Sequence, residues 1–74
     1  MGEIARIFLA WQFIRTIKEV IRQIADESGR APIDEVIEQI AQKGFAKDEI
    51  QKQIEMFLRQ GEAMEPKPGI IKLI

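Results

Sequence analysis

Residues 61–74 have the sequence GEAMEPKPGIIKLI, and this stretch predicts a short β-hairpin. Pro68 presets φ at the first central position of a turn, and Gly69 supplies the positive φ that a type II turn requires at the second. After the turn, Ile71 and Leu73 flank a lysine, which is the period-2 pattern of a strand with one buried face. We expect this hairpin to close a core that is built by the residues before it.

A first long helix is predicted over residues 4–26. Its second half has apolar residues at the 3, 4, 7 spacing of an amphipathic helix. This stripe consists of Ala10, Phe13, Ile14, Ile17, Val20, Ile21 and Ile24. Gly29, which follows Ser28, is expected to end the helix as its C′ residue.

The first half of the same helix has a second apolar stripe, formed by Ile4, Ile7, Phe8 and Trp11. It is rotated away from the first stripe, so one small core cannot cover both. We therefore expect residues 1–13 to be an apolar linker or helix extension. The four stripe residues are expected to form an interface with the parent chain or with another copy.

A second helix is predicted over residues 34–43, with Asp34 as its N-cap and an inner face of Ile33, Val36, Ile37, Ile40 and Ala41. Residues 30–32 before it are expected to be extended, as a short first strand. Gly44 closes the helix, and Phe45 is expected to plug the core at the short turn that follows.

A third helix is predicted over residues 47–60. Ala46 stands where Ser, Thr or Asp would normally cap, so the helix starts weakly, with partial compensation from two acids in its first turn. Three helices followed by a hairpin predict a mostly helical α+β fold, a winged helix-turn-helix domain over residues 14–74. The expected core is Ile14, Ile17, Ile21, Ile24, Val36, Ile40, Ile50, Ile54, Phe57 and Leu58, closed by Ile71 and Leu73.

Composition limits the possible functions of the 74 residues. The length suits one domain, and 46% hydrophobic with 31% charged residues suits a folded chain. Cysteine and histidine are absent, which excludes disulfides and a structural zinc site. No apolar run reaches the roughly 18 residues of a membrane span, and the N-terminus lacks a signal-peptide cleavage pattern. No cofactor is expected.

The sequence of residues 61–74, a GExxEPKPG motif followed by an Ile/Lys/Leu strand, resembles that of the C-terminal winged-helix domain of the archaeal MCM replicative helicase. The resemblance is sharpest over these residues and extends as a pattern back to about residue 31. It implies a non-catalytic module that modulates an ATP-driven motor on the same polypeptide and contacts partners such as initiator or loader proteins. It also implies a cytoplasmic, nucleoid-associated protein of an archaeon. The chain has no Gly-rich phosphate loop, so we expect no enzymatic activity from it.

The residues expected to touch DNA phosphates or a partner are the cations near the helix-turn-helix corner, the third helix and the hairpin tip. They are Lys43, Lys47, Lys52, Arg59 and Lys67, and Met56 is a further candidate for a protein contact.

The outer face of the third helix carries three acids and two bases, with Asp48–Lys52 and Glu55–Arg59 spaced as i,i+4 pairs. A dedicated DNA reader would have a basic stripe there. The family's wing often has aromatics where this chain has Ala63, Met64 and Ile70, which removes base-stacking platforms. The sequence therefore predicts weak, sequence-independent DNA binding at most.

Two alternatives remain open at this point. One is a stand-alone winged-helix transcription regulator that binds DNA. The other is an oligomerisation element driven by the N-terminal helix.

Overall fold

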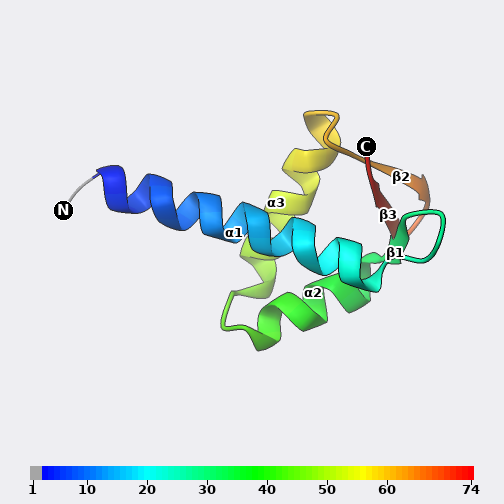
Figure 1. The fold of residues 1–74 in the computed structure, drawn as a ribbon, viewed down its shortest axis with the longest axis horizontal. Helices are drawn as coiled ribbons and strands as arrows, with labels where there is room; N and C mark the ends of the chain where they lie inside the picture. Colours follow the sequence, from blue (N-terminus) through cyan, green and yellow to red (C-terminus); the bar gives the residue numbers. More distant parts are fainter. Residues whose placement is uncertain (1–2) are drawn as a thin grey trace.

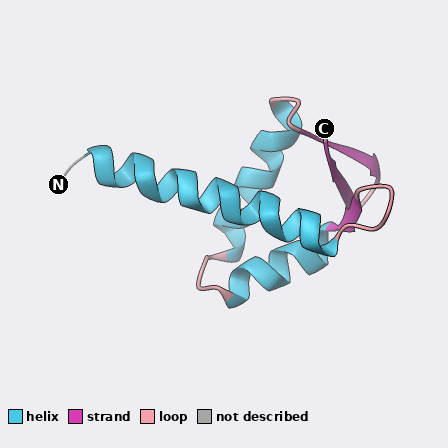
Figure 2. Cartoon of the chain, viewed as in Figure 1, coloured by secondary structure: helices cyan, strands magenta, loops and turns pink. Residues whose placement is uncertain are grey.

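Residues 3–74 form three helices and a small three-stranded antiparallel sheet (Figures 1 and 2). This computed structural model describes the backbone of residues 3–74 and the side chains of residues 10–74. The elements in chain order are α1 (Glu3–Ile24), β1 (Arg30–Pro32), α2 (Ile33–Gln42), α3 (Lys47–Arg59), β2 (Ala63–Lys67) and β3 (Ile70–Leu73). The predicted α+β, mostly helical class is confirmed.

The sheet joins a strand from the middle of the chain to the C-terminal hairpin. Its strand order is β1-β3-β2, so β3 pairs on one side with its hairpin neighbour and on the other with β1, some forty residues earlier in the chain. The hairpin turn has Gly69 at φ +83, as the Pro-Gly pair predicted. The predicted first strand at residues 30–32 is confirmed as well.

The core lies between the three helices and the inner face of the sheet. Its fully buried members come from all six elements: Ile17, Val20, Ile21, Ala31, Val36, Ile37, Ile40, Ile50, Ile54, Phe57, Ala63 and Ile71. Of the predicted core residues, Ile14, Ile24, Leu58 and Leu73 are only partly buried and pack against its margin. Ala31 and Ala63 were missed, because an alanine becomes buried only when the sheet register brings it over the helices.

The predicted C-terminal end of α1 was wrong. α1 ends at Ile24, and Gly29, at φ +84, lies in the following loop and is not a C′ residue. The Asp26 carboxylate holds this loop by accepting hydrogen bonds from the backbone N–H and hydroxyl of Ser28 and from the backbone N–H of Arg30. These local bonds compete with continuation of the helix.

The predicted N-cap of α2 was also wrong. Pro32 occupies the cap position without a side-chain hydrogen bond, and Asp34 lies inside the first turn. The predicted weak start of α3 is confirmed, since Ala46 is its N-cap residue and makes no side-chain hydrogen bond. α3 ends at Arg59, one residue earlier than predicted.

The N-terminal turns of α1 extend beyond the rest of the structure (Figure 1). Among the described side chains, Phe13 is the first of α1 to pack against the core, and its ring lies 4.9 Å from that of Phe45, centroid to centroid. Phe45 therefore covers the edge of the core as expected. Trp11 is 64% exposed.

The backbone of residues 4–8 continues α1, but the side chains of Ile4, Ile7 and Phe8 lie outside the described part of the chain. The interface expected at these residues stays a prediction. No helix within the described residues is long and apolar enough to cross a membrane.

Candidate interaction surfaces

The corner between α2 and α3 holds two of the predicted cations. Lys43 is the C-cap residue of α2. The next residue, Gly44, has a φ of +104, and this positive φ lets the chain turn between α2 and α3. Lys47 opens α3, and its Nζ lies 3.2 Å from a carboxylate oxygen of Glu38 on α2. Both partners are more than half exposed, so this ion pair is weak, but it engages one of the cations expected to meet DNA.

The outer face of α3 is exposed as predicted and is slightly acidic. It consists of Asp48, Glu49, Lys52, Glu55, Met56 and Arg59, and Met56 is 45% exposed. The i,i+4 pairs predicted for Lys52 and Arg59 do not form among the described residues. Exposed pairs of this kind gain little free energy, so each side chain remains hydrated.

The predicted cations do not gather into one patch. Lys47 and Arg59 are at opposite ends of α3, about 18 Å apart at 1.5 Å per residue. Lys67 lies elsewhere, at the end of β2, where it lines a hollow together with Glu35 in the first turn of α2. A ligand on the α2–α3 corner would therefore not reach the hairpin tip through these side chains alone.

The outer face of the sheet is a surface that sequence reasoning missed. The register aligns Arg30, Lys72 and Met64 across the three strands in one row, and Pro32, Ile70 and Lys67 in the next. The buried residues Ala31 and Ile71 lie between these rows and point to the core, so both rows face outward. The alternation of Ile71, Lys72 and Leu73 in the sequence hinted at this face, but only the register brings its members together.

A hollow of about 490 Å³ lies at one end of this outer face. Its apolar walls are Ile24, Pro32 and Ile70, and its charged members are Asp26, Arg30, Glu35 and Lys67. The Asp26 carboxylate accepts hydrogen bonds from Ser28 and Arg30 of its own loop. The Ser28 hydroxyl first, and then the backbone N–H of Arg30, hold the pKa of its carboxyl below the ordinary value.

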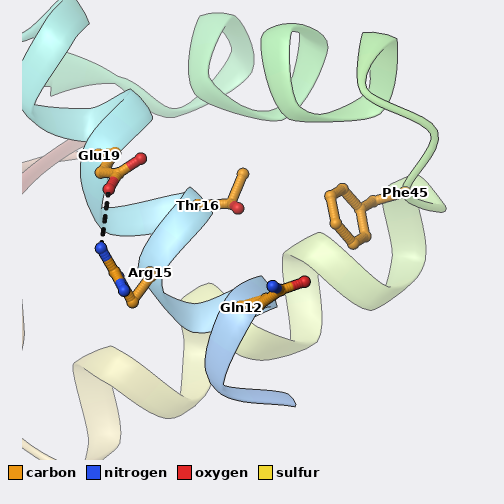
Figure 3. Close-up of a pocket in the computed structure, with 5 residues that line it drawn as sticks. All are labelled: Gln12, Arg15, Thr16, Glu19 and Phe45. Atoms are coloured by element: carbon orange, nitrogen blue, oxygen red, sulfur yellow. Dashed lines mark ion pairs between the residues drawn. The ribbon is translucent and has the colours of Figure 1, made fainter. Parts of the chain in front are cut away.

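A second hollow, of about 320 Å³, lies between α1 and the α2–α3 turn (Figure 3). Figure 3 shows the Phe45 ring facing Thr16 and Gln12, with Arg15 and Glu19 paired on the other side at 3.8 Å. These groups form no nucleophile–base pair. Within the described residues there is also no group of three acidic side chains that could hold a metal ion.

The junction of α1, α3 and the hairpin is held by one lysine. The Nζ of Lys18 lies 3.3 Å from a carboxylate oxygen of Glu62 and 5.5 Å from the centroid of the Phe57 ring. The carbonyl of Glu62 in turn accepts a hydrogen bond from the backbone N–H of Ile74. These contacts fix the start of β2 against α1 and have a structural role.

The chain is similar to a known protein. The chain is 28% identical over 61 residues to an uncharacterized MCM-type protein of Methanocaldococcus jannaschii. The matched region is 82% of this chain and 9% of that protein, so the chain spans less than a tenth of its relative's length. No protein family model matches the sequence. No solved structure matches it either.

Proposed function

We propose that this chain is the non-catalytic C-terminal winged-helix module of an MCM-type replicative helicase. In this role, residues 14–74 form the winged helix and residues 1–13 the linker. The module would modulate the ATP-driven motor through protein contacts and bind DNA weakly, without sequence preference. The observation that carries the proposal is the similarity to an MCM-type protein over 82% of the chain.

The topology supports the winged-helix part of the proposal. The order α1-β1-α2-α3-β2-β3, in which two helices joined by a short turn precede a hairpin, agrees with the proposed helix-turn-helix with a hairpin wing. The short turn after α2, with its glycine at positive φ, is typical of such a corner.

The charge distribution supports weak DNA binding. In helix-turn-helix proteins the second helix of the motif contacts DNA, and in this proposal that helix is α3. The outer face of α3 presents three acids and two bases, and Lys47 is already paired with Glu38. Phosphate contacts supply most of nucleic-acid affinity, and they need unpaired cations close together. The same charges count against the alternative of a stand-alone transcription regulator, although the helix-turn-helix geometry favours one.

The protein contacts of the proposed module are expected at α1. Its N-terminal turns project past the core, and Trp11 is largely exposed. In the proposed role this segment meets the motor or its linker. An oligomerisation element would use the same turns.

The test compares an MCM-type motor that carries this module with the same motor lacking residues 30–74. ATP hydrolysis and unwinding should persist, with rates or partner responses changed by roughly 5–150-fold, the range of typical coupling energies. Complete loss of ATPase activity in a hexamer that still assembles would refute the modulating role. A mass measurement across concentration separates this role from oligomerisation through α1.

DNA retardation tests the alternative. Labelled duplex and single-stranded DNA should be shifted only at low salt and with no preference for sequence. A nanomolar, sequence-selective complex at physiological salt would instead favour the transcription regulator.

A further inference from the structure

We propose that the outer face of the sheet binds an acidic peptide segment of a partner protein, anchored by one bulky apolar side chain. This inference rests on the proposed role as a protein-interaction module and names the surface and the chemistry of the partner. The face is defined by the two outward rows, Arg30, Lys72 and Met64 in one and Pro32, Ile70 and Lys67 in the other.

The outer face of the sheet is positively charged. Three of its six residues are cations and none is an acid, in a chain whose net charge is −1. Arg30 and Lys72 are directly opposite one another on neighbouring strands. Like charges directly opposite one another destabilise a sheet, so the pairing of these two cations does not stabilise the fold. Among the described residues, none of the three cations forms an ion pair.

The other half of the face is apolar. Met64 is 44% exposed, Pro32 is exposed, and Ile70 is half-buried. Pro32 and Ile70 also form, with Ile24, the apolar wall of the 490 Å³ hollow. A hollow of this kind accepts an apolar side chain, while the cations around it meet carboxylates on either side of that anchor.

The occupant that fits both halves is a peptide and not a nucleic acid. A phosphate backbone would leave the apolar wall without a partner, and the face has no aromatic ring on which a base could stack. Glu35 at the edge of the hollow repels any anion beside it, and a peptide can place its central apolar residue there, whereas every nucleotide carries a phosphate. Asp26 remains a negative charge at the hollow, and three hydrogen bonds from its own loop hold one of its carboxylate oxygens in place.

The test is an NMR titration of the full chain with a synthetic peptide that has two Glu on each side of a central Leu. We expect the amide signals of residues 30, 64, 67, 70 and 72 to shift. Changing the central Leu of the peptide to Ala should weaken binding about tenfold, because the anchor is lost. A peptide with Lys in place of Glu should not bind, and oligothymidylate should bind more weakly than the acidic peptide.

The variants Arg30→Gln and Lys72→Gln should each weaken peptide binding about two- to fivefold, as expected for exposed ion pairs. Lys43→Gln and Lys52→Gln are the matched controls, since each removes one exposed cation outside the face, and they should leave the affinity unchanged. The dispersion of the NMR signals verifies that each variant is folded.

Three outcomes would overturn the proposal. They are shifts that map to α3, equal effects of Lys43→Gln and Arg30→Gln, or the absence of shifts at millimolar peptide. Shifts of the same residues by oligothymidylate at lower concentration than by the peptide would assign the face to nucleic acid. The motor-deletion experiment needs no peptide, so failure here is distinguishable from failure of the modulating role.

Discussion

The backbone N–H of Ile33 donates a hydrogen bond of 2.8 Å to the carbonyl oxygen of Gly69, so the first turn of α2 is tied to the hairpin turn. The N–H of Gly69 in turn donates to a carboxylate oxygen of Glu65 at 2.9 Å. The first N–H groups of a helix need partners, and Pro32 at the cap position offers no side-chain acceptor. The hairpin turn supplies one of these partners, which also holds Lys67 close to α2.

Replacing Gly69 with Ala should destabilise the fold by about 1–2 kcal/mol. The reason is the φ of +83 alone, because a Cβ at this position would meet nothing within 4 Å. Gly69→Asn is the matched control and should cost less, since Asn tolerates this conformation better. Urea unfolding measures both. Equal stability of Gly69→Ala and the unchanged chain would contradict the role given to this turn.

Replacing Ile54 with Ala should cost about 2–5 kcal/mol of unfolding free energy. Ile54 is 3% exposed in the centre of the core, so truncation leaves a cavity that the packed helices fill only in part. Met56→Ala, two positions along on the exposed face of α3, should change stability by less than about 0.5 kcal/mol. A thermal midpoint that survives the Ile54 change would show that this residue is not in the core.

Replacing Ala46 with Ser should stabilise the chain by about 1 kcal/mol. The cap position of α3 now lacks a side-chain acceptor, and a Ser there would form a capping box with Glu49 three residues later. Ala46→Val, which offers no oxygen, should give no gain. Thermal unfolding of the two variants and the parent checks the difference, and a gain from both would point to a cause other than capping.

Asp26 should make stability depend on acid pH. Its folded pKa is lowered below the ordinary 3.8 by the Ser28 hydroxyl first and the Arg30 backbone N–H second. A depressed carboxyl pKa contributes stability that is present above pH 3.8 and is lost as pH falls through the folded pKa. Carbon-13 NMR should show the Asp26 pKa rising toward 3.8 in Ser28→Ala.

Glu27→Gln is the control for that titration, because Glu27 makes no hydrogen bond to Asp26 among the described contacts. It should leave the pKa of Asp26 where it is. An unchanged pKa in Ser28→Ala would mean that the backbone N–H groups alone hold the carboxylate ionised.

The local elements were predictable because their signals are local. The apolar stripes of α2 and α3 and the Pro68-Gly69 turn each depend on residues a few positions apart, and each was confirmed. The predicted ends of α1 and α2 were wrong. α1 ends early because the Asp26 carboxylate accepts hydrogen bonds from the residues that follow it. The N-terminus of α2 is held by a hydrogen bond that Ile33 donates to the carbonyl of Gly69 in the hairpin turn, 36 residues later along the chain.

The amino-acid sequence by itself determined the number of helices, the hairpin and most of the core. The reason is that the spacing of large apolar residues within a short segment indicates both the type of element and the face that it buries. Only the tertiary structure decided which surfaces exist. It separated Lys47, Arg59 and Lys67, which the sequence had grouped, and placed Arg30 opposite Lys72 on the outer face of the sheet. Strand register is set by packing between segments far apart in the chain, so no local pattern could have specified that face.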